Sequence, residues 1–180
     1  MKLVLGITDA SGAPYAASAL RFLKQAGIHT DVVFTKTGRL VWEHEIGPLP
    51  DGFHIWNPTD FTVPFASDST RYDGMLVIPC SSGSLARMAH GLSIDLIGRA
   101  ADVMLKERRP LVLVLREMPL SLVHLRNMTQ LVEAGAVVMP ASPSFYSKPA
   151  TMDALVDTVV CRALDHLGVD NDLMTRWKSP

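Results

Sequence analysis

Short apolar runs alternate with segments of helical periodicity along most of the chain. Continuous apolar runs are typical of strands that are buried on both faces of a parallel sheet. Apolar residues at three- and four-residue spacing are typical of amphipathic helices. The pattern predicts strands at residues 3–7, 30–35, 75–79, 111–115 and 136–139, with a further short strand at 53–56. It predicts helices at residues 14–25, 38–45, 83–91, 94–106, 120–134 and 152–167.

The regular alternation of strand and helix predicts an α/β fold. We expect a three-layer, Rossmann-like open parallel sheet with helices on both faces, joined by right-handed crossovers. No internal repeat or linker divides the chain, so residues 1–180 are predicted to form a single domain. The periodicity fails over residues 47–73, which contain four prolines and are predicted as an irregular connection. A connection of this length is often a lid or an oligomer contact, and a mobile surface segment is the alternative.

Composition narrows the class of protein. Hydrophobic residues make up 48% of the chain and charged residues 19%, which is typical of a globular domain. Mean hydropathy of +0.19 favours subunit contacts, although a core-rich monomer has the same composition. The 17 basic and 18 acidic residues nearly cancel, so we expect neither nucleic-acid nor membrane binding. The chain lacks a signal-peptide pattern and an apolar stretch of ~20 residues, and we expect a cytoplasmic protein. Cys80 and Cys161 show no CxxC spacing, so neither a disulfide nor a metal site is expected.

Polar or rigid turns follow each of the five main predicted strands. Ligands bind beyond the carboxyl ends of the strands in open parallel sheets. The first turn reads TDASG and the third reads PCSSGS; both are rich in hydroxyls and lead directly into a helix, where backbone N–H groups can face an anion. Neither turn matches GxGxxG or GxxxxGK[ST], which argues against a dinucleotide or nucleoside triphosphate site. Two such turns at neighbouring strand ends favour a ligand that carries a phosphate.

Five segments of the chain are distinctive, and they read TDASG, PCSSGSLARMAHGLSIDLIGRAADVMLKERRPLVLVLRE, PLSLVHLRNM, EAGAVVMPASPSFY and LVDTVVCRALDHLGV. Together they resemble the UbiX/Pad1 flavin prenyltransferases over nearly the whole chain, least between Gly47 and Asp73. The resemblance implies transfer of a dimethylallyl group from dimethylallyl phosphate to N5 and C6 of reduced FMN, without a metal. It also implies that prenylated FMN passes to a UbiD-type decarboxylase. The family typically forms a homo-dodecamer whose neighbouring subunits build each site.

The resemblance also implies residue roles, position by position. The implied FMN contacts are Asp9, Ala10, Ser11, Thr35, Ser81, Ser82, Gly83, Ser84 and Arg116. The implied contacts to dimethylallyl phosphate are Arg99, Lys106, Glu117, Tyr146 and Arg162. The implied catalytic residues are Ser11, Glu45 and Glu117. Ser11 is expected to hydrogen-bond near flavin N5, Glu45 to accept the C6 proton, and Glu117 to protonate or orient the phosphate.

One position departs from the family pattern, because this chain reads DASG where relatives usually read GASG. The Asp9 carboxylate would repel a phosphate if it faced the ligand, or it would be harmless if it capped the following helix; we favour the cap. Asp9 also motivates one alternative, an FMN-binding accessory protein without transferase activity. A second alternative is a flavin-dependent cysteine decarboxylase, although the PASANT and PxMN elements of those enzymes are missing here.

Overall fold

The computed structural model describes residues 1–177, and its elements follow the predicted alternation. They are β1 (Lys2–Ile7), α1 (Ala13–Gln25), β2 (His29–Phe34), α2 (Lys36–Glu45), β3 (His54–Trp56), the 3₁₀ turn η1 (Pro64–Ala66), β4 (Gly74–Cys80), α3 (Ser82–Ala89), α4 (Leu96–Lys106), β5 (Leu111–Leu115), α5 (Leu122–Glu133), β6 (Val137–Pro140) and α6 (Met152–His166).

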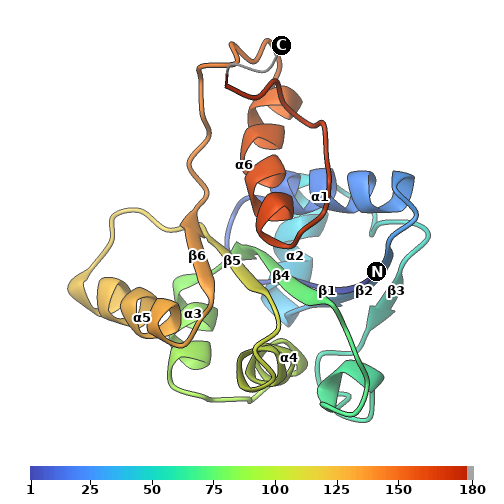
Figure 1. Cartoon of the computed structure of the whole chain (residues 1–180), viewed down its shortest axis with the longest axis vertical. Helices are drawn as coiled ribbons and strands as arrows, with labels where there is room; N and C mark the ends of the chain where they lie inside the picture. The colour runs from blue at the N-terminus through green and yellow to red at the C-terminus, as the bar shows by residue number, and fades with distance from the viewer. Residues whose placement is uncertain (178–180) are drawn as a thin grey trace.

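The six strands form one parallel sheet in the order β3-β2-β1-β4-β5-β6. Helices α1, α2 and α6 cover one face, and α3, α4 and α5 cover the other, as the ribbon in Figure 1 shows. The predicted three-layer, single-domain α/β fold is therefore confirmed. The strand order reverses direction between β1 and β4, and in open sheets of this kind a ligand crevice lies beyond the carboxyl ends at that point.

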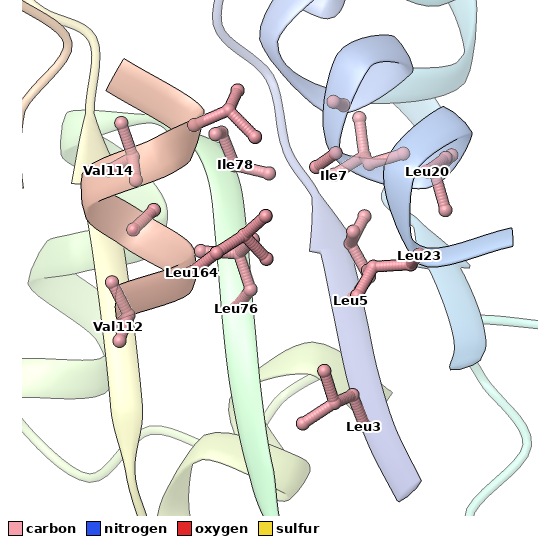
Figure 2. Packing of buried hydrophobic residues seen from close by; sticks show 14 of the residues in the cluster. Leu3, Leu5, Ile7, Leu20, Leu23, Leu76, Ile78, Val112, Val114 and Leu164 are labelled. Atoms are coloured by element: carbon pink, nitrogen blue, oxygen red, sulfur yellow. The ribbon is translucent and has the colours of Figure 1, made fainter. Parts of the chain in front are cut away.

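The central strands are apolar throughout because both faces of the sheet are covered. On β1, Leu3, Leu5 and Ile7 pack towards α1 and α6, whereas Val4 packs towards α3 and α4. Figure 2 shows Leu5 and Ile7 beside Leu20 and Leu23 of α1, and Leu76 of β4 beside Leu164 of α6. Each fully buried leucine stabilises the fold by roughly 1.5–3 kcal/mol. The packing fixes the strand ends, and the strand ends in turn position the polar turns.

Five of the six predicted helices begin one or two residues away from the predicted start, and capping explains two of these differences. The helix predicted to begin at Ile94 begins at Leu96, because the Asp95 carboxylate accepts a hydrogen bond from the N–H of Gly98 at 2.7 Å and ends the preceding turn. The helix predicted from Gly38 begins at Lys36, because the Thr35 hydroxyl accepts from the N–H of Gly38 at 3.0 Å.

The connection over residues 47–73 holds the short strand β3 and the turn η1, and it is tied to the sheet through Asp31 on β2. Asp31 is 3% exposed and accepts hydrogen bonds from Trp56 Nε1 at 2.8 Å and from the Tyr72 hydroxyl at 2.5 Å. His29 Nε2 lies 3.1 Å from the same carboxylate. Burial, and then Asp31, raise the pKa of Tyr72 and keep its hydroxyl protonated. Within residues 1–177, no helix is long and apolar enough to cross a membrane.

Candidate functional site

The turns after β1 and β4 are locked together by Thr8, which is fully buried. Its hydroxyl donates to the carbonyl of Pro79 at 3.0 Å and accepts from the N–H of Ser81 at 2.7 Å. A single side chain therefore satisfies one carbonyl and one N–H where two strands end, in a place that water does not reach. The two hydroxyl-rich turns are held side by side as a result.

A cleft of about 380 Å³ opens at this edge of the sheet. It is lined by Asp9, Ala10, Ser11, Ser81, Ser82, Gly83, Arg116 and Glu117. All eight are residues that the resemblance implied for the site, and they come from three strand ends. The structure thus brings them together at one cleft, and their individual roles stay predictions. Three larger hollows, of about 550, 490 and 430 Å³, lie elsewhere on the described part of the chain and include none of the predicted site residues.

The turn after β1 is held from the side by Glu45, the last residue of α2. Its carboxylate accepts hydrogen bonds from the N–H of Gly12 at 2.9 Å and of Ala13 at 2.8 Å, where α1 begins. Partial burial on its own raises the pKa of Glu45, but hydrogen bonds from Ser11, Gly12 and Ala13 outweigh it and lower the pKa overall. Glu45 is consequently ionised at neutral pH.

Asp9 does not cap α1, and that prediction is wrong. The N-cap of α1 is Gly12, which has no capping side chain of its own, and the N–H groups there are already satisfied by Glu45. Asp9 instead accepts a hydrogen bond from the Thr35 hydroxyl at 2.5 Å, and it lies 3.8 Å from Nη2 of Arg87. Thr35, which is 8% exposed, therefore contacts the turn after β1 through Asp9.

The turn after β4 is organised by Ser81, the N-cap of α3. Its hydroxyl accepts from the N–H of Ser84 at 3.2 Å and donates to the Ser84 hydroxyl at 3.1 Å. Ser81 and Ser84 are buried, whereas Ser82 and Gly83 face the cleft more openly. The neighbouring Cys80 thiol is fully buried, and this burial raises its pKa to about 12, so it stays protonated and unreactive.

Arg116 and Glu117 close the third side of the cleft, just after β5. Arg116 Nε donates to the carbonyl of Ser11 at 3.1 Å, and the Ser82 hydroxyl donates to Glu117 at 2.7 Å. The hydrogen bond from Ser82, followed by one from the N–H of Met118, lowers the pKa of Glu117. Glu117 is thus a carboxylate at neutral pH in the free protein.

The four other residues implied for the phosphate do not meet within one chain. Arg99 and Lys106 lie on α4, where Arg99 Nε donates to the carbonyl of Ala66 at 2.9 Å and Lys106 pairs with Asp68. Tyr146 lies in the segment after β6. Arg162 lies on α6, which covers the opposite face of the sheet from α4, and its Nη1 donates to Asp165 at 2.8 Å. A phosphate site that contains all four requires more than one copy of the chain.

Sequence reasoning missed three contributors to this edge. Thr8 was included in the first turn without a role, although its hydroxyl joins the turns after β1 and β4. The use of Glu45 as a cap for another helix leaves no local signal in the sequence. Arg87 carried a detectable signal, because it lies three residues after Ser84 on a predicted helix and therefore on the same face. Within residues 1–177, no group of three or more histidine, cysteine, aspartate or glutamate side chains is placed to hold a metal.

Comparison with known proteins agrees with this geometry. The family model described as Flavoprotein matches residues 1–164. The flavin prenyltransferase UbiX of Thermoplasma acidophilum is 44% identical over 182 residues, which cover 98% of this chain and all of that protein. The crystal structure of AnUbiX (PadA1) in complex with FMN and dimethylallyl pyrophosphate has a TM-score of 0.95 at 40% identity, covering 99% of this chain and 97% of that one.

A second solved structure matches equally fully. The dodecameric FMN-dependent UbiX-like decarboxylase of Escherichia coli O157:H7 has a TM-score of 0.93 at 42% identity, over 99% of this chain and 100% of that one. These matches, which cover nearly the whole chain, lead to one conclusion. The chain belongs to the flavoprotein family and, within it, to the UbiX flavin prenyltransferases.

Proposed function

We propose that this chain transfers a dimethylallyl group from dimethylallyl phosphate to N5 and C6 of reduced FMN, without a metal ion. The observation that carries the proposal is the single cleft lined by eight of the implied site residues. The names of the relatives support the reaction, and the AnUbiX complex with FMN and dimethylallyl pyrophosphate supports FMN and a dimethylallyl donor. FMN supplies the ring that is alkylated; the protein binds it, orients it and moves protons.

The chemistry of the cleft suits a flavin mononucleotide. Hydroxyls and backbone N–H groups from the first turn of α3 favour a phosphate oxygen, because a helix N-terminus carries a partial positive charge. Ala10 and Gly83 offer small surfaces against which a flat ring fits closely. We assign FMN binding to Asp9, Ala10, Ser11, Thr35, Ser81, Ser82, Gly83, Ser84 and Arg116. Thr35 and Ser84 act from behind the cleft wall.

The leaving phosphate is bound by three cations and the Tyr146 hydroxyl, which come from neighbouring copies. Arg99 and Lys106 come from α4 of one copy, and Tyr146 and Arg162 come from another, because α4 and α6 cover opposite faces of one chain. Such cations stabilise the charge that develops on a departing phosphate by roughly 3 kcal/mol for each well-placed donor. The dodecameric relative supports an assembly of this kind, and we propose a homo-oligomer, most simply a dodecamer.

The two carboxylates have different tasks. Glu45 is ionised and hydrogen-bonded beside Ser11, which suits a base that accepts the proton from flavin C6 during ring closure. Ser11 is the hydroxyl that hydrogen-bonds near N5. Glu117 is also ionised in the free protein, so it orients the cations around the phosphate; the charge of a bound phosphate would raise its pKa and let it carry a proton.

The prenylated flavin is a product that another enzyme must use. We propose that a UbiD-type decarboxylase receives it, a step that the family resemblance supports. A test is decarboxylation by such an apo-enzyme supplied with this chain, reduced FMN and the prenyl donor. A cytoplasmic location stays a prediction, which cell fractionation would check.

The experiment that tests the function is an anaerobic incubation of the protein with dithionite-reduced FMN and dimethylallyl phosphate. We expect the flavin to gain the mass of one dimethylallyl unit while inorganic phosphate is released in equal amount. Oxidised FMN is the control and should give neither. Tight FMN binding without mass gain or phosphate release would instead indicate the accessory-protein alternative. Carbon dioxide release from a peptidyl or pantothenoyl cysteine would indicate the decarboxylase.

A further inference from the structure

A carboxylate in a cleft proposed to bind an anionic cofactor needs a compensating charge. Asp9 lines the cleft together with Glu117, and Arg116 is the cation that lines it with them. Glu45, also ionised, holds the adjacent turn. Three carboxylates therefore surround a site that has to accept a phosphate, and one lining arginine does not balance them. Like charges at short range disfavour binding in a site with little water.

Arg87 supplies a second cation from behind the wall of the cleft. It lies on α3, with Nη2 at 3.8 Å from Oδ2 of Asp9 and 2.9 Å from the Ser84 hydroxyl, to which it donates. Its Nη1 lies 3.6 Å from the point where a side chain on Gly83 would begin, so the guanidinium borders a residue of the cleft. The side chains of Arg87 and Asp9 are 30% and 31% exposed, and their attraction is only partly screened by water.

The surrounding hydrogen bonds fix the position of this pair. Asp9 is held on its other oxygen by the Thr35 hydroxyl, whose own oxygen caps α2. Arg87 is held by Ser84, which bonds Ser81 at the start of α3. The ion pair and these hydrogen bonds together join the turns after β1, β2 and β4 behind the wall of the cleft. It also gives the aspartate at position 9 a partner that the sequence pattern did not reveal.

We propose that Arg87 is a positioning residue of the flavin site: it neutralises Asp9, so that the turn after β1 accepts the anionic FMN. The inference rests on the proposed function, since it assumes that FMN occupies this cleft. It explains how a chain that reads DASG in place of GASG would bind FMN. It also makes Asp9 and Arg87 a coupled pair, whose separate removal has opposite consequences for the charge of the site.

The test is a double-mutant cycle on flavin affinity, using Arg87→Ala, Asp9→Asn and the two together. We expect Arg87→Ala to raise the Kd for FMN about tenfold or more, because it leaves the carboxylate unpaired in the site. The double variant with both Arg87→Ala and Asp9→Asn should have a Kd for FMN within about threefold of that of Asp9→Asn alone. Arg87→Lys keeps the charge and should lose less than Arg87→Ala.

Riboflavin, which lacks the phosphate, separates charge from structure. Arg87→Ala should weaken FMN binding clearly more than riboflavin binding. Arg39→Ala is the matched control, since it also removes one arginine and one ion pair, with Glu43 at 3.0 Å, from the exposed surface of α2. Equal losses for FMN and riboflavin, or no recovery in the double variant, would overturn the inference. Melting temperatures identify any variant that is misfolded. If Arg87→Ala is misfolded, the FMN affinity of Arg87→Lys becomes the deciding measurement.

Failure of the proposed function is recognised separately. If the wild-type chain binds no FMN or forms no prenylated flavin, the function itself is wrong. If the wild-type chain does both and Arg87→Ala binds FMN as tightly as wild type, only the role of Arg87 is wrong.

Discussion

The carboxylate of Glu45 accepts a hydrogen bond of 2.9 Å from the N–H of Gly12, so the end of α2 caps the beginning of α1. Side-chain caps normally come from the residue just before the helix. Here the cap arrives from 33 positions along the chain, and the same carboxylate lies next to Ser11 in the proposed site. Stability and the proposed catalysis would therefore depend on the same side chain.

Glu45→Gln is expected to affect both properties. At pH 7 we expect the variant to lose about 1–2 kcal/mol of unfolding free energy, since an ionised cap is replaced by a neutral one. The folded-state pKa of Glu45 is lowered, so its contribution is fully present above the ordinary carboxyl value of 4.5 and is lost as pH falls through the lower folded value. Urea titrations from pH 7 to pH 3 should show the difference between wild type and variant closing below about pH 4.5.

Glu43→Gln is the control for that experiment, because Glu43 lies on the same helix and is exposed. It should change stability by less than about 0.5 kcal/mol. The rate of prenylated flavin formation should fall in Glu45→Gln at an unchanged Kd for FMN. A variant with the turnover of wild type would remove Glu45 from the mechanism.

Thr8→Val tests the bond between the two turns. Valine has nearly the shape of threonine, but it leaves the carbonyl of Pro79 and the N–H of Ser81 without their partner in the interior. We expect a loss of about 1–3 kcal/mol in unfolding free energy, together with weaker FMN binding as the turns separate. Thr8→Ser retains the hydroxyl and should recover most of the FMN affinity. Denaturant unfolding and flavin fluorescence titration measure the two effects, and full affinity in Thr8→Val would contradict the role given to this bond.

Mixing two inactive variants tests whether neighbouring copies share the phosphate site. Arg99→Ala and Arg162→Ala should each be nearly inactive, and coexpressed they should recover up to about a quarter of wild-type activity, because random assembly gives some sites both intact residues. Arg99→Ala coexpressed with Lys106→Ala should recover nothing, since both residues lie on α4 and come from the same copy. Phosphate release is the measurement. Recovery in neither mixture would place all the cations in one chain.

The outer surface of α5 tests the proposed assembly. Leu122 and Val123 are 60% and 62% exposed, and Val132 is 54% exposed, which leaves an apolar surface that a lone chain would present to water. Leu122→Glu combined with Val123→Glu should lower the particle mass measured by light scattering after gel filtration, because unpaired charges at an apolar contact are costly. Gln130→Glu adds a charge elsewhere on α5 and should leave the mass unchanged. Unaltered mass in the double variant would exclude this helix from the interface.

The fold was predictable because both faces of the sheet are covered. β4 is buried along its whole length, and such a strand is a continuous apolar run that periodicity detects. β3 is short and only partly buried, so its pattern was weaker and its first residue differed by one. Helix starts were displaced where an N-cap preceded the apolar face, as at Asp95. Caps depend on single side chains, which a periodic pattern averages out.

The site was predictable only where it is local. Turns such as those around Ser11 and Ser82 follow strands directly, so the sheet alone brings them to one edge. The cap on α1 was assigned to Asp9 because short-range rules favour the nearest carboxylate, yet a distant one, Glu45, fills that place. The ion pair of Asp9 with Arg87 joins the turn after β1 to α3, and no spacing along the sequence encodes it.

The buried carboxylate of Asp31 lies outside the cleft, yet it affects residues that are proposed to bind the phosphate. Through Trp56 and Tyr72 it fastens both limbs of the connection, and between them the carbonyl of Ala66 and the side chain of Asp68 hold Arg99 and Lys106. If neighbouring copies share the phosphate, the connection over residues 47–73 positions the cations of one subunit for the substrate of another. A substitution at Asp31 would then lower the activity of the site on the neighbouring subunit, while the cleft of its own subunit would keep its structure.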